Sequence, residues 1–239
     1  MEILIELVPS RKFLEYAKAV ANYVDGFDIP ESPMGVPRPS STVVGAVLKR
    51  VLGHDYTVVS HVRLSDINPV ALASTVMGAE VAELDGVLLT VGDKPVYGSS
   101  VNQLSSEQAA EFLRSIGVRI ALGAILSMRY ELNAIRSRVE KPFDFFYALR
   151  VSIDSIEKLS RVSEIVTGLG KKLYAYAIIA TQRNREFIEK ELRQPYIELP
   201  KLSEFVEHVQ DLVNGVIISC PLDREGQIES VKLLHSLQR

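Results

Sequence analysis

The chain has 239 residues, of which 47% are hydrophobic and 24% are charged, and its formal net charge is -3. This composition is typical of a globular protein, and it offers no basic surface for nucleic acid or an anionic membrane. No apolar run approaches the roughly 20 residues that span a bilayer, and the acidic N-terminus is unlike a signal peptide. The single cysteine, Cys220, excludes an internal disulfide and a cysteine-based metal cluster. We therefore expect a cytoplasmic protein.

Apolar, β-branched runs alternate with amphipathic stretches along the whole chain. The predicted strands are 3–8, 26–30, 57–60, 86–91, 118–122, 143–149, 173–179 and 215–219. The predicted helices are 10–24, 42–51, 68–84, 107–116, one that ends at Lys141, 154–169, 183–192, 202–213 and 227–238. Eight strand–helix pairs with short connections predict an α/β fold, a single-domain (β/α)8 TIM barrel over residues 1–239. An open, doubly wound sheet is the alternative.

Polar residues gather where the third and fourth predicted strands end. His61 and Asp66 follow one strand, and Gly92-Asp93 follows the other. The two strands and the helix between them form a right-handed βαβ unit, and such units keep their ligands at the carboxyl ends of the strands. Because no second histidine lies at metal-ligand spacing from His61, we expect no metal site.

Glu6 interrupts an apolar strand near its C-terminal end. Burial of a carboxylate among leucines and valines is costly unless the group is paired or protonated. Glu6 is therefore either the partner of a basic residue inside the barrel or a general acid whose pKa is raised by burial. Asp93 has a similar pair of interpretations, a turn residue beside Gly92 or a group that faces a ligand.

The motif His61-x4-Asp66, followed by an apolar strand that ends in Gly92-Asp93, resembles the flavin and folate core of methylenetetrahydrofolate reductases. The resemblance implies a flavin-dependent oxidoreductase of one-carbon metabolism, which reduces the methylene group carried by a folate or related pterin. It implies FAD, with FMN as the alternative, and NAD(P)H as the reductant. The family's polar residues after the fifth strand are missing here, which predicts weak or partial flavin occupancy.

The same resemblance assigns roles to individual residues. Glu6, in Glu6-Leu7-Val8-Pro9, matches the family's Glu-x-x-Pro and would protonate N10 of the folate, and Asp93 would lie between pterin and flavin. The residues assigned to the flavin are His61, Asp66, Thr90, Gly92, Arg38 and Arg129. The residues assigned to the pterin carrier are Glu31, Tyr147 and Arg224. The sixth strand departs from the family, because its end reads Tyr147-Ala148-Leu149-Arg150 in place of Ile-Thr-Gln-Pro.

Two other functions stay open at this point. One is a flavin-free methyltransferase that moves a methyl group from the pterin carrier, and the other is a non-catalytic binding subunit of a one-carbon complex. A fold by itself does not choose among these three. In each case the partner is a small molecule rather than nucleic acid or a membrane, and a homo-oligomer or a partner subunit is compatible with the sequence.

Overall fold

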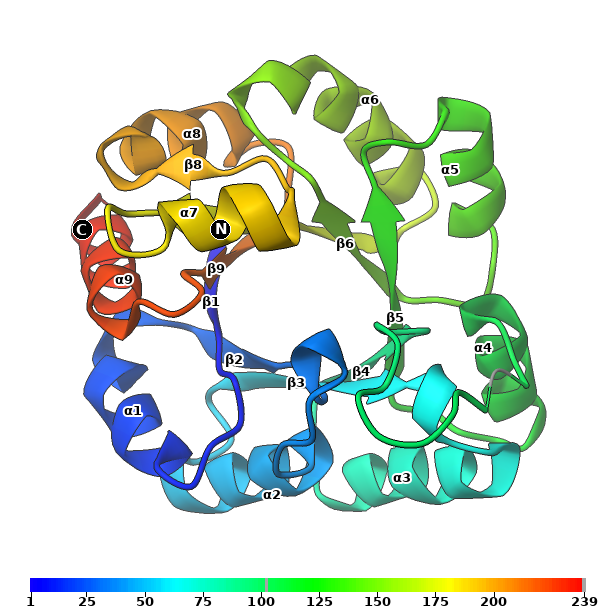
Figure 1. The fold of residues 1–239 in the computed structure, drawn as a ribbon. Helices are drawn as coiled ribbons and strands as arrows, with labels where there is room; N and C mark the ends of the chain where they lie inside the picture. Colours follow the sequence, from blue (N-terminus) through cyan, green and yellow to red (C-terminus); the bar gives the residue numbers. More distant parts are fainter. Residues whose placement is uncertain (102, 238–239) are drawn as a thin grey trace.

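Eight parallel strands form a closed ring with the helices outside it, in the part of the chain that the structure describes, residues 1–101 and 103–237 (Figure 1). We analysed this arrangement in a computed structural model. The ring strands are β1 (Glu2–Glu6), β2 (Gly26–Ile29), β3 (Thr57–Arg63), β4 (Gly86–Thr90), β5 (Ala121–Ser127), β6 (Phe145–Leu149), β7 (Lys172–Ala180) and β9 (Gly215–Ser219). Pairing of β1 with β9 and of β6 with β7 closes the ring. The predicted TIM barrel is confirmed.

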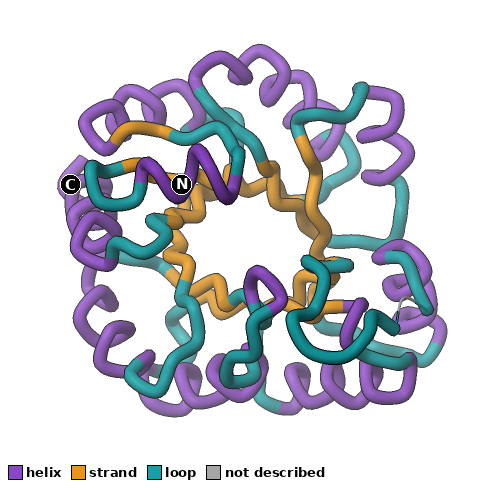
Figure 2. Tube along the Cα trace, in the orientation of Figure 1, coloured by secondary structure: helices purple, strands orange, loops and turns teal. Residues whose placement is uncertain are grey.

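The helices surround this ring (Figure 2), and all of those longer than one turn contribute buried apolar residues to the core that packs on the strands. They are α1 (Phe13–Val20), α2 (Ser41–Leu52), α3 (Pro69–Val81), α4 (Ser106–Ser115), α5 (Leu132–Val139), α6 (Ile156–Thr167), α7 (Arg185–Phe187), α8 (Leu202–Val209) and α9 (Arg224–Leu237). Local signals fix some of their starts: Asn68 caps α3, and Ser105 and Gln108 form a capping box on α4. The predicted last residue of the final helix, Gln238, lies outside the described residues.

The interior of the ring is filled by alternate residues of each strand, because successive side chains of a strand point to opposite faces. Its buried apolar residues are Leu4, Val59, Leu88, Phe145, Tyr147, Tyr174 and Ile217. Glycines on neighbouring strands make room for the largest of them: a Cβ on Gly123 would lie 2.1 Å from the Phe145 ring, and one on Gly86 would lie 2.9 Å from it. The interior is therefore a packed core and not a pore.

The fifth strand differs most from its prediction, since β5 covers Ala121–Ser127 and not 118–122. Val118 and Ile120 are buried in the connection after α4, where the side chain of Glu80 accepts the Ile120 N–H. The small residues of the true strand have low strand propensity, but the ring needs them opposite Phe145. Tertiary packing thus outweighs the local preference, and residues 123–127, which follow the predicted strand, belong to the true one.

Two smaller differences matter for the site. β3 extends to Arg63, so His61 lies within a strand and not in the loop after it. A short strand that was not predicted, β8 (Ile197–Glu198), pairs with the end of β7 outside the ring.

The contact between Gly123 and Phe145 can be tested directly. Gly123→Ala is expected to lower the free energy of unfolding by about 1–3 kcal/mol, because the added methyl group overpacks the ring interior. Denaturant unfolding measures the change. Gly78→Ala is the matched control, since a Cβ there meets nothing within 4 Å and alanine in a helix is favoured over glycine by about 0.5–1 kcal/mol. Equal effects of the two substitutions would contradict this account of the interior.

Candidate functional site

Polar side chains replace apolar ones in the layer of the ring interior nearest the C-terminal mouth. Glu6 ends β1, and its register partner on β2 is Asp28. His61, Tyr176 and Ser219 come from β3, β7 and β9. Because parallel strands end at the same side of a barrel, their last inward residues meet in one layer. This polar layer lies where barrels of this fold carry their active sites.

Glu6 is the centre of the polar layer. The Tyr176 hydroxyl donates to its Oε1 at 2.6 Å, and the Ser219 hydroxyl donates to its Oε2 at 2.5 Å. Burial raises the pKa of the Glu6 carboxyl above its ordinary value, the nearby charge of Asp28 raises it further, and the two hydrogen bonds oppose the rise. Burial, together with the charge of Glu6, also raises the pKa of Tyr176, which keeps this hydroxyl a donor.

Beside Glu6 lies a buried pair of Asp28 and His61. Asp28 is fully buried, and its Oδ1 lies 2.7 Å from Nε2 of His61. A carboxylate only accepts, so Nε2 of His61 carries the hydrogen in this contact. Among the described residues, Asp28 Oδ2 and the hydroxyl of the buried Tyr147 have no hydrogen-bond partner. Burial and the charge of Asp28 raise the pKa of Tyr147.

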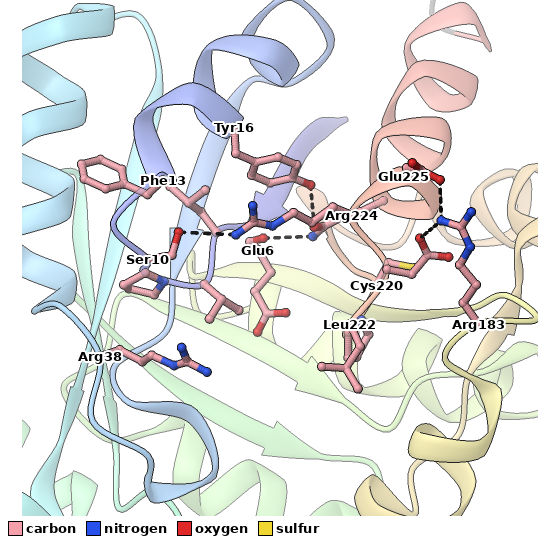
Figure 3. Close-up of a pocket in the computed structure, with 16 residues that line it drawn as sticks. Glu6, Ser10, Phe13, Tyr16, Arg38, Arg183, Cys220, Leu222, Arg224 and Glu225 are labelled. Carbon is pink, nitrogen blue, oxygen red and sulfur yellow. Dashed lines mark hydrogen bonds and ion pairs between the residues drawn. The ribbon is translucent and has the colours of Figure 1, made fainter.

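A cavity of about 470 Å³ opens onto Glu6 (Figure 3). Its walls are the loops after β1, β7 and β9 with Arg38 from the loop after β2. Figure 3 shows the Glu6 carboxylate between Arg38 and Leu222. The cavity connects this buried acid with solvent and has the size that a small metabolite needs.

The charged side chains around this cavity are unevenly paired. Arg183 pairs with Asp223 and Glu225. Arg224, in contrast, has no carboxylate partner in the described residues: its guanidinium lies over the Tyr16 ring and contacts the Ser10 hydroxyl. The side chain of Arg38 has no hydrogen bond or ion pair within the described part of the chain. Two arginines are thus free to bind an anion.

The thiol of Cys220, which also lines the cavity, has a pKa raised to about 12, mainly by burial. At neutral pH it is therefore protonated and is a poor nucleophile.

Gln227 of α9 connects the C-terminal ends of two barrel strands with helix α1. Its amide nitrogen donates to the carbonyls of Glu6 and Ile218, each at 2.9 Å, and its oxygen accepts from the Tyr16 hydroxyl. The side chain thereby links the ends of β1 and β9 to α1. The backbone of Glu6 is fixed by these bonds, so the carboxyl group is held in place as well as buried.

The motif residues of the sequence meet at a different point, around the buried side chain of Arg63. Its guanidinium donates to the Asp66 carboxylate at 2.6 Å, to the carbonyl of Asp93 at 2.6 Å and to the carbonyl of Ser32 at 3.1 Å. The carboxylate of Asp93 accepts the N–H of Met34. Asp66 and Asp93 thus tie the loops after β2 and β4 to β3, and we call this arrangement the Arg63 clamp.

Gly92 and Gly35 are needed for the close approach of these loops. Both have positive φ, 80° and 73°. A Cβ on Gly35 would lie 2.1 Å from the Lys94 carbonyl oxygen, and one on Gly92 would lie 3.0 Å from the Arg63 guanidinium. The flat group that lies against Gly92 is therefore this guanidinium, at the place that the resemblance gave to a flavin ring. FAD, FMN and NAD(P)H stay predictions, since nothing in the described residues tests them.

The remaining predicted residues are spread around the mouth. Glu31 accepts the N–H of Ser41 at 2.8 Å and so caps α2. Thr90 ends β4 opposite Arg63, and Arg129 lies exposed after β5. Of the predicted set, the structure brings Glu6, His61 and Tyr147 into or beside the polar layer and places Arg38 and Arg224 at the cavity. Asp93 lies in an exposed loop and, in the described structure, does not contact Glu6.

Sequence reasoning missed several residues of the site: Asp28, Tyr176, Ser219, Gln227 and Arg63. One of them carried a usable signal, because Asp28 is an acid inside an apolar strand, as Glu6 is. The others are common residue types whose importance depends on contacts between segments that are far apart in the chain.

Neither a membrane span nor a metal cluster is found in the described residues. None of the helices there is both long and apolar enough to cross a bilayer. The same residues hold no group of three or more metal-ligating side chains at suitable positions.

Comparison with known proteins identifies the fold but no family. No family model matches the sequence, and no curated protein matches it. A tryptophan synthase complex from Pyrococcus furiosus shares 13% identity at a TM-score of 0.64, with 98% of this chain and 96% of that chain covered. A mutant tryptophan synthase alpha-subunit from the same organism shares 12% identity at a TM-score of 0.65, with 98% of each chain covered. A third structure is an a2b2 tryptophan synthase complex, again at 12% identity, with a TM-score of 0.63 and with 98% and 95% covered.

These structures contradict the predicted flavin-dependent reduction of a pterin carrier. The three structures above, which share the fold over nearly the whole chain, are tryptophan synthase structures and not flavin reductases. The oxidoreductase assignment is therefore wrong. At this identity the likeness itself establishes the barrel, and the chemistry has to be argued from the site.

The raised pKa of Glu6 makes a prediction about stability. Above its ordinary value of 4.5 the folded chain holds this proton more tightly than the unfolded chain. The stabilising contribution is complete below about pH 4.5 and is lost as the pH rises through the folded-state pKa. Glu6→Gln cannot titrate, so the wild type is expected to lose stability relative to it, by at most about 1.4 kcal/mol per pH unit in this window.

Urea unfolding of both proteins from about pH 4 to pH 8 measures the difference. Glu2→Gln, at the other end of β1, is the control. Parallel pH profiles for the wild type and Glu6→Gln would show that burial does not shift the pKa of Glu6.

Proposed function

We propose that this chain is an enzyme that transfers protons to and from a small anionic substrate, with Glu6 as the acid and His61 as the second proton-transfer group. The reaction class is that of a lyase or an isomerase, in which a C–H or C–X bond is broken with acid and base help. The observation that carries the proposal is a buried carboxyl group of raised pKa at the wall of a cavity that opens at the mouth of the barrel.

Glu6 has the properties that a general acid needs. Its raised pKa lets it hold a proton closer to neutral pH than an exposed glutamate does, and its position at the cavity wall allows a substrate to reach it. The hydroxyls of Tyr176 and Ser219 fix both carboxyl oxygens, so proton transfer requires no reorientation. After Glu6 has given up its proton, the same two donors stabilise the carboxylate that is left.

His61 of β3 is the second residue of the polar layer that can carry a transferable proton. Its Nε2 donates to Asp28 Oδ1 at 2.7 Å, and this hydrogen bond fixes the orientation of the ring. The ring is only 12% exposed, so the pair is shielded from bulk water.

The free arginines of the cavity indicate the charge of the substrate. Arg183 pairs with Asp223 and Glu225, whereas Arg38 and Arg224 have no carboxylate partner among the described residues. A carboxylate or phosphate ester would neutralise them, and arginine binds both groups with two parallel hydrogen bonds. The neighbours in fold support an enzyme without fixing its reaction, since they are structures of tryptophan synthase. One of them is an a2b2 complex, and by analogy we propose that this chain also binds a partner subunit.

Proton transfer can be detected before the natural substrate is known. Small oxo-acids and phosphate esters of hydroxyketones are incubated with the enzyme in D2O, and mass spectrometry follows deuterium entering acidic C–H positions. Glu6→Gln is expected to lower the exchange rate about 10²–10⁴-fold, the usual share of one acid–base group. Glu2→Gln is the matched control, because Glu2 lies on the same strand at the opposite end of the barrel and contacts Tyr174. Absence of exchange with the whole panel, or equal loss in both variants, would contradict the proposal.

The anion contacts predict a different kinetic effect. Arg38→Gln is expected to raise KM about 10- to 100-fold with little change in kcat, because it removes a charge-assisted hydrogen bond made equally to substrate and transition state. Arg161→Gln on α6 is the control, since Arg161 forms a surface pair with Glu157 far from the cavity. A fall in kcat alone would show that Arg38 acts in the chemical step and does not merely bind.

A further inference from the structure

A second group of arginines lies at the mouth of the barrel, directly after β5 and β6. Arg129 follows β5 and Arg150 follows β6. The two strands are paired up to their ends, where the Met128 N–H donates to the Leu149 carbonyl at 3.0 Å, so both arginines leave the barrel at the same level. The Arg150 guanidinium donates to the carbonyl of Arg193, in the loop after β7, at 3.1 Å. We call Arg129 and Arg150 the β5–β6 arginine pair.

No carboxylate neutralises the β5–β6 arginine pair in the described part of the chain. The guanidinium of Arg150 bonds there only to a neutral carbonyl, and the hydrogen bond of Arg129 is made by its backbone. Glu131 and Asp154, the next acids after β5 and β6, are exposed and bond to neither arginine. The pKa of Arg150 is lowered, chiefly by partial burial and further by the positive charge of Arg129. The two charges therefore repel each other, and a bound anion would relieve this repulsion.

The backbone at the end of β6 is strained where it holds this guanidinium. The φ angle of Arg150 is 66°, in the left-handed region that long side chains rarely adopt. Arg193, whose carbonyl accepts the hydrogen bond, has a φ of 50° and is left-handed as well. Residues in such conformations persist where the surrounding structure fixes them, and they cluster at ligand-binding sites. The strain thus agrees with a guanidinium that is placed for binding.

The β5–β6 arginine pair lies across the mouth from the cavity at Glu6. β5 is the fourth strand from β1 in both directions around the ring, so it stands opposite the strand that carries Glu6 (Figure 1). Arg38 and Arg224, in contrast, line the cavity on the Glu6 side. Eight strands about 4.8 Å apart and tilted by about 36° close into a ring roughly 15 Å across. Arginine side chains on both sides shorten this span, so one sugar-sized molecule can reach both groups.

We propose that the β5–β6 arginine pair is a second anion subsite, and that the substrate carries an anionic group at each of its two ends. This inference rests on the proposed function: Arg38 and Arg224 hold one end, and the polar layer acts on the carbons between the ends. Each end is a phosphate or a carboxylate, because guanidinium groups bind both with charge-assisted hydrogen bonds. A neutral far end would leave the charges of Arg129 and Arg150 uncompensated at the rim.

Titration calorimetry with a hexitol that carries a phosphate at each end tests the second subsite without turnover. The full chain is expected to bind one molecule of this bisphosphate, at least about 100-fold more tightly than the hexitol monophosphate, because only the bisphosphate engages both groups of arginines. Arg150→Gln is expected to weaken binding of the bisphosphate about 10- to 100-fold, the share of a hydrogen bond to a charged group. The same substitution is expected to change the affinity for the monophosphate far less.

Arg136→Gln is the control, because Arg136 is also exposed and, among the described residues, also without an ion pair, but it lies on α5 outside the ring. Circular dichroism checks that both variants are folded. The proposal is overturned by two bisphosphates per chain, by equal affinity for the two hexitol phosphates, by no binding at millimolar concentration, or by equal effects of the two substitutions. Because the titration needs no turnover, a failure of proton exchange in D2O would overturn the role of Glu6 and leave this result standing.

Discussion

Closure of the strands into a ring is the constraint on which the rest of the structure depends. Once β1 pairs with both β2 and β9, alternate residues of every strand must share one narrow interior. Gly123 is needed because Phe145 fills the space beside it. The same closure sets the last inward residues of the strands face to face, so polar groups that are far apart in sequence form a layer at the mouth.

The chemistry of Glu6 follows from that layer. A carboxyl group in such a place loses most of its water, and the neighbouring Asp28 adds a like charge, so the neutral form is favoured. Tyr176 and Ser219 limit this effect by donating hydrogen bonds. Burial and hydrogen bonding together therefore give a group that can both hold and release a proton, while the arginines at the cavity make its surroundings suitable for an anion.

The motif residues Asp66, Gly92 and Asp93 have a structural role in this chain. Asp66, Asp93 and Gly92 surround Arg63, which ties three segments of the mouth together through buried hydrogen bonds. Such a clamp explains the aspartates and the glycine without a flavin. The compared structures with the same barrel are tryptophan synthase structures, and at 12–13% identity they establish the fold alone. Function has to be argued from the groups that line the cavity.

The sequence by itself determined the alternation of strands and helices, the barrel and the unusual position of Glu6, because apolar periodicity and a buried acid are local signals. It also marked His61, Arg38 and Arg224. Only the tertiary structure decided the true bounds of β5 and the hydrogen-bond partners of Glu6. Ser219 lies 213 residues from Glu6 in the chain and bonds to it only after the ring has closed. No local pattern indicates a contact that forms only when the ring closes. The sequence alone therefore could not predict the polar layer.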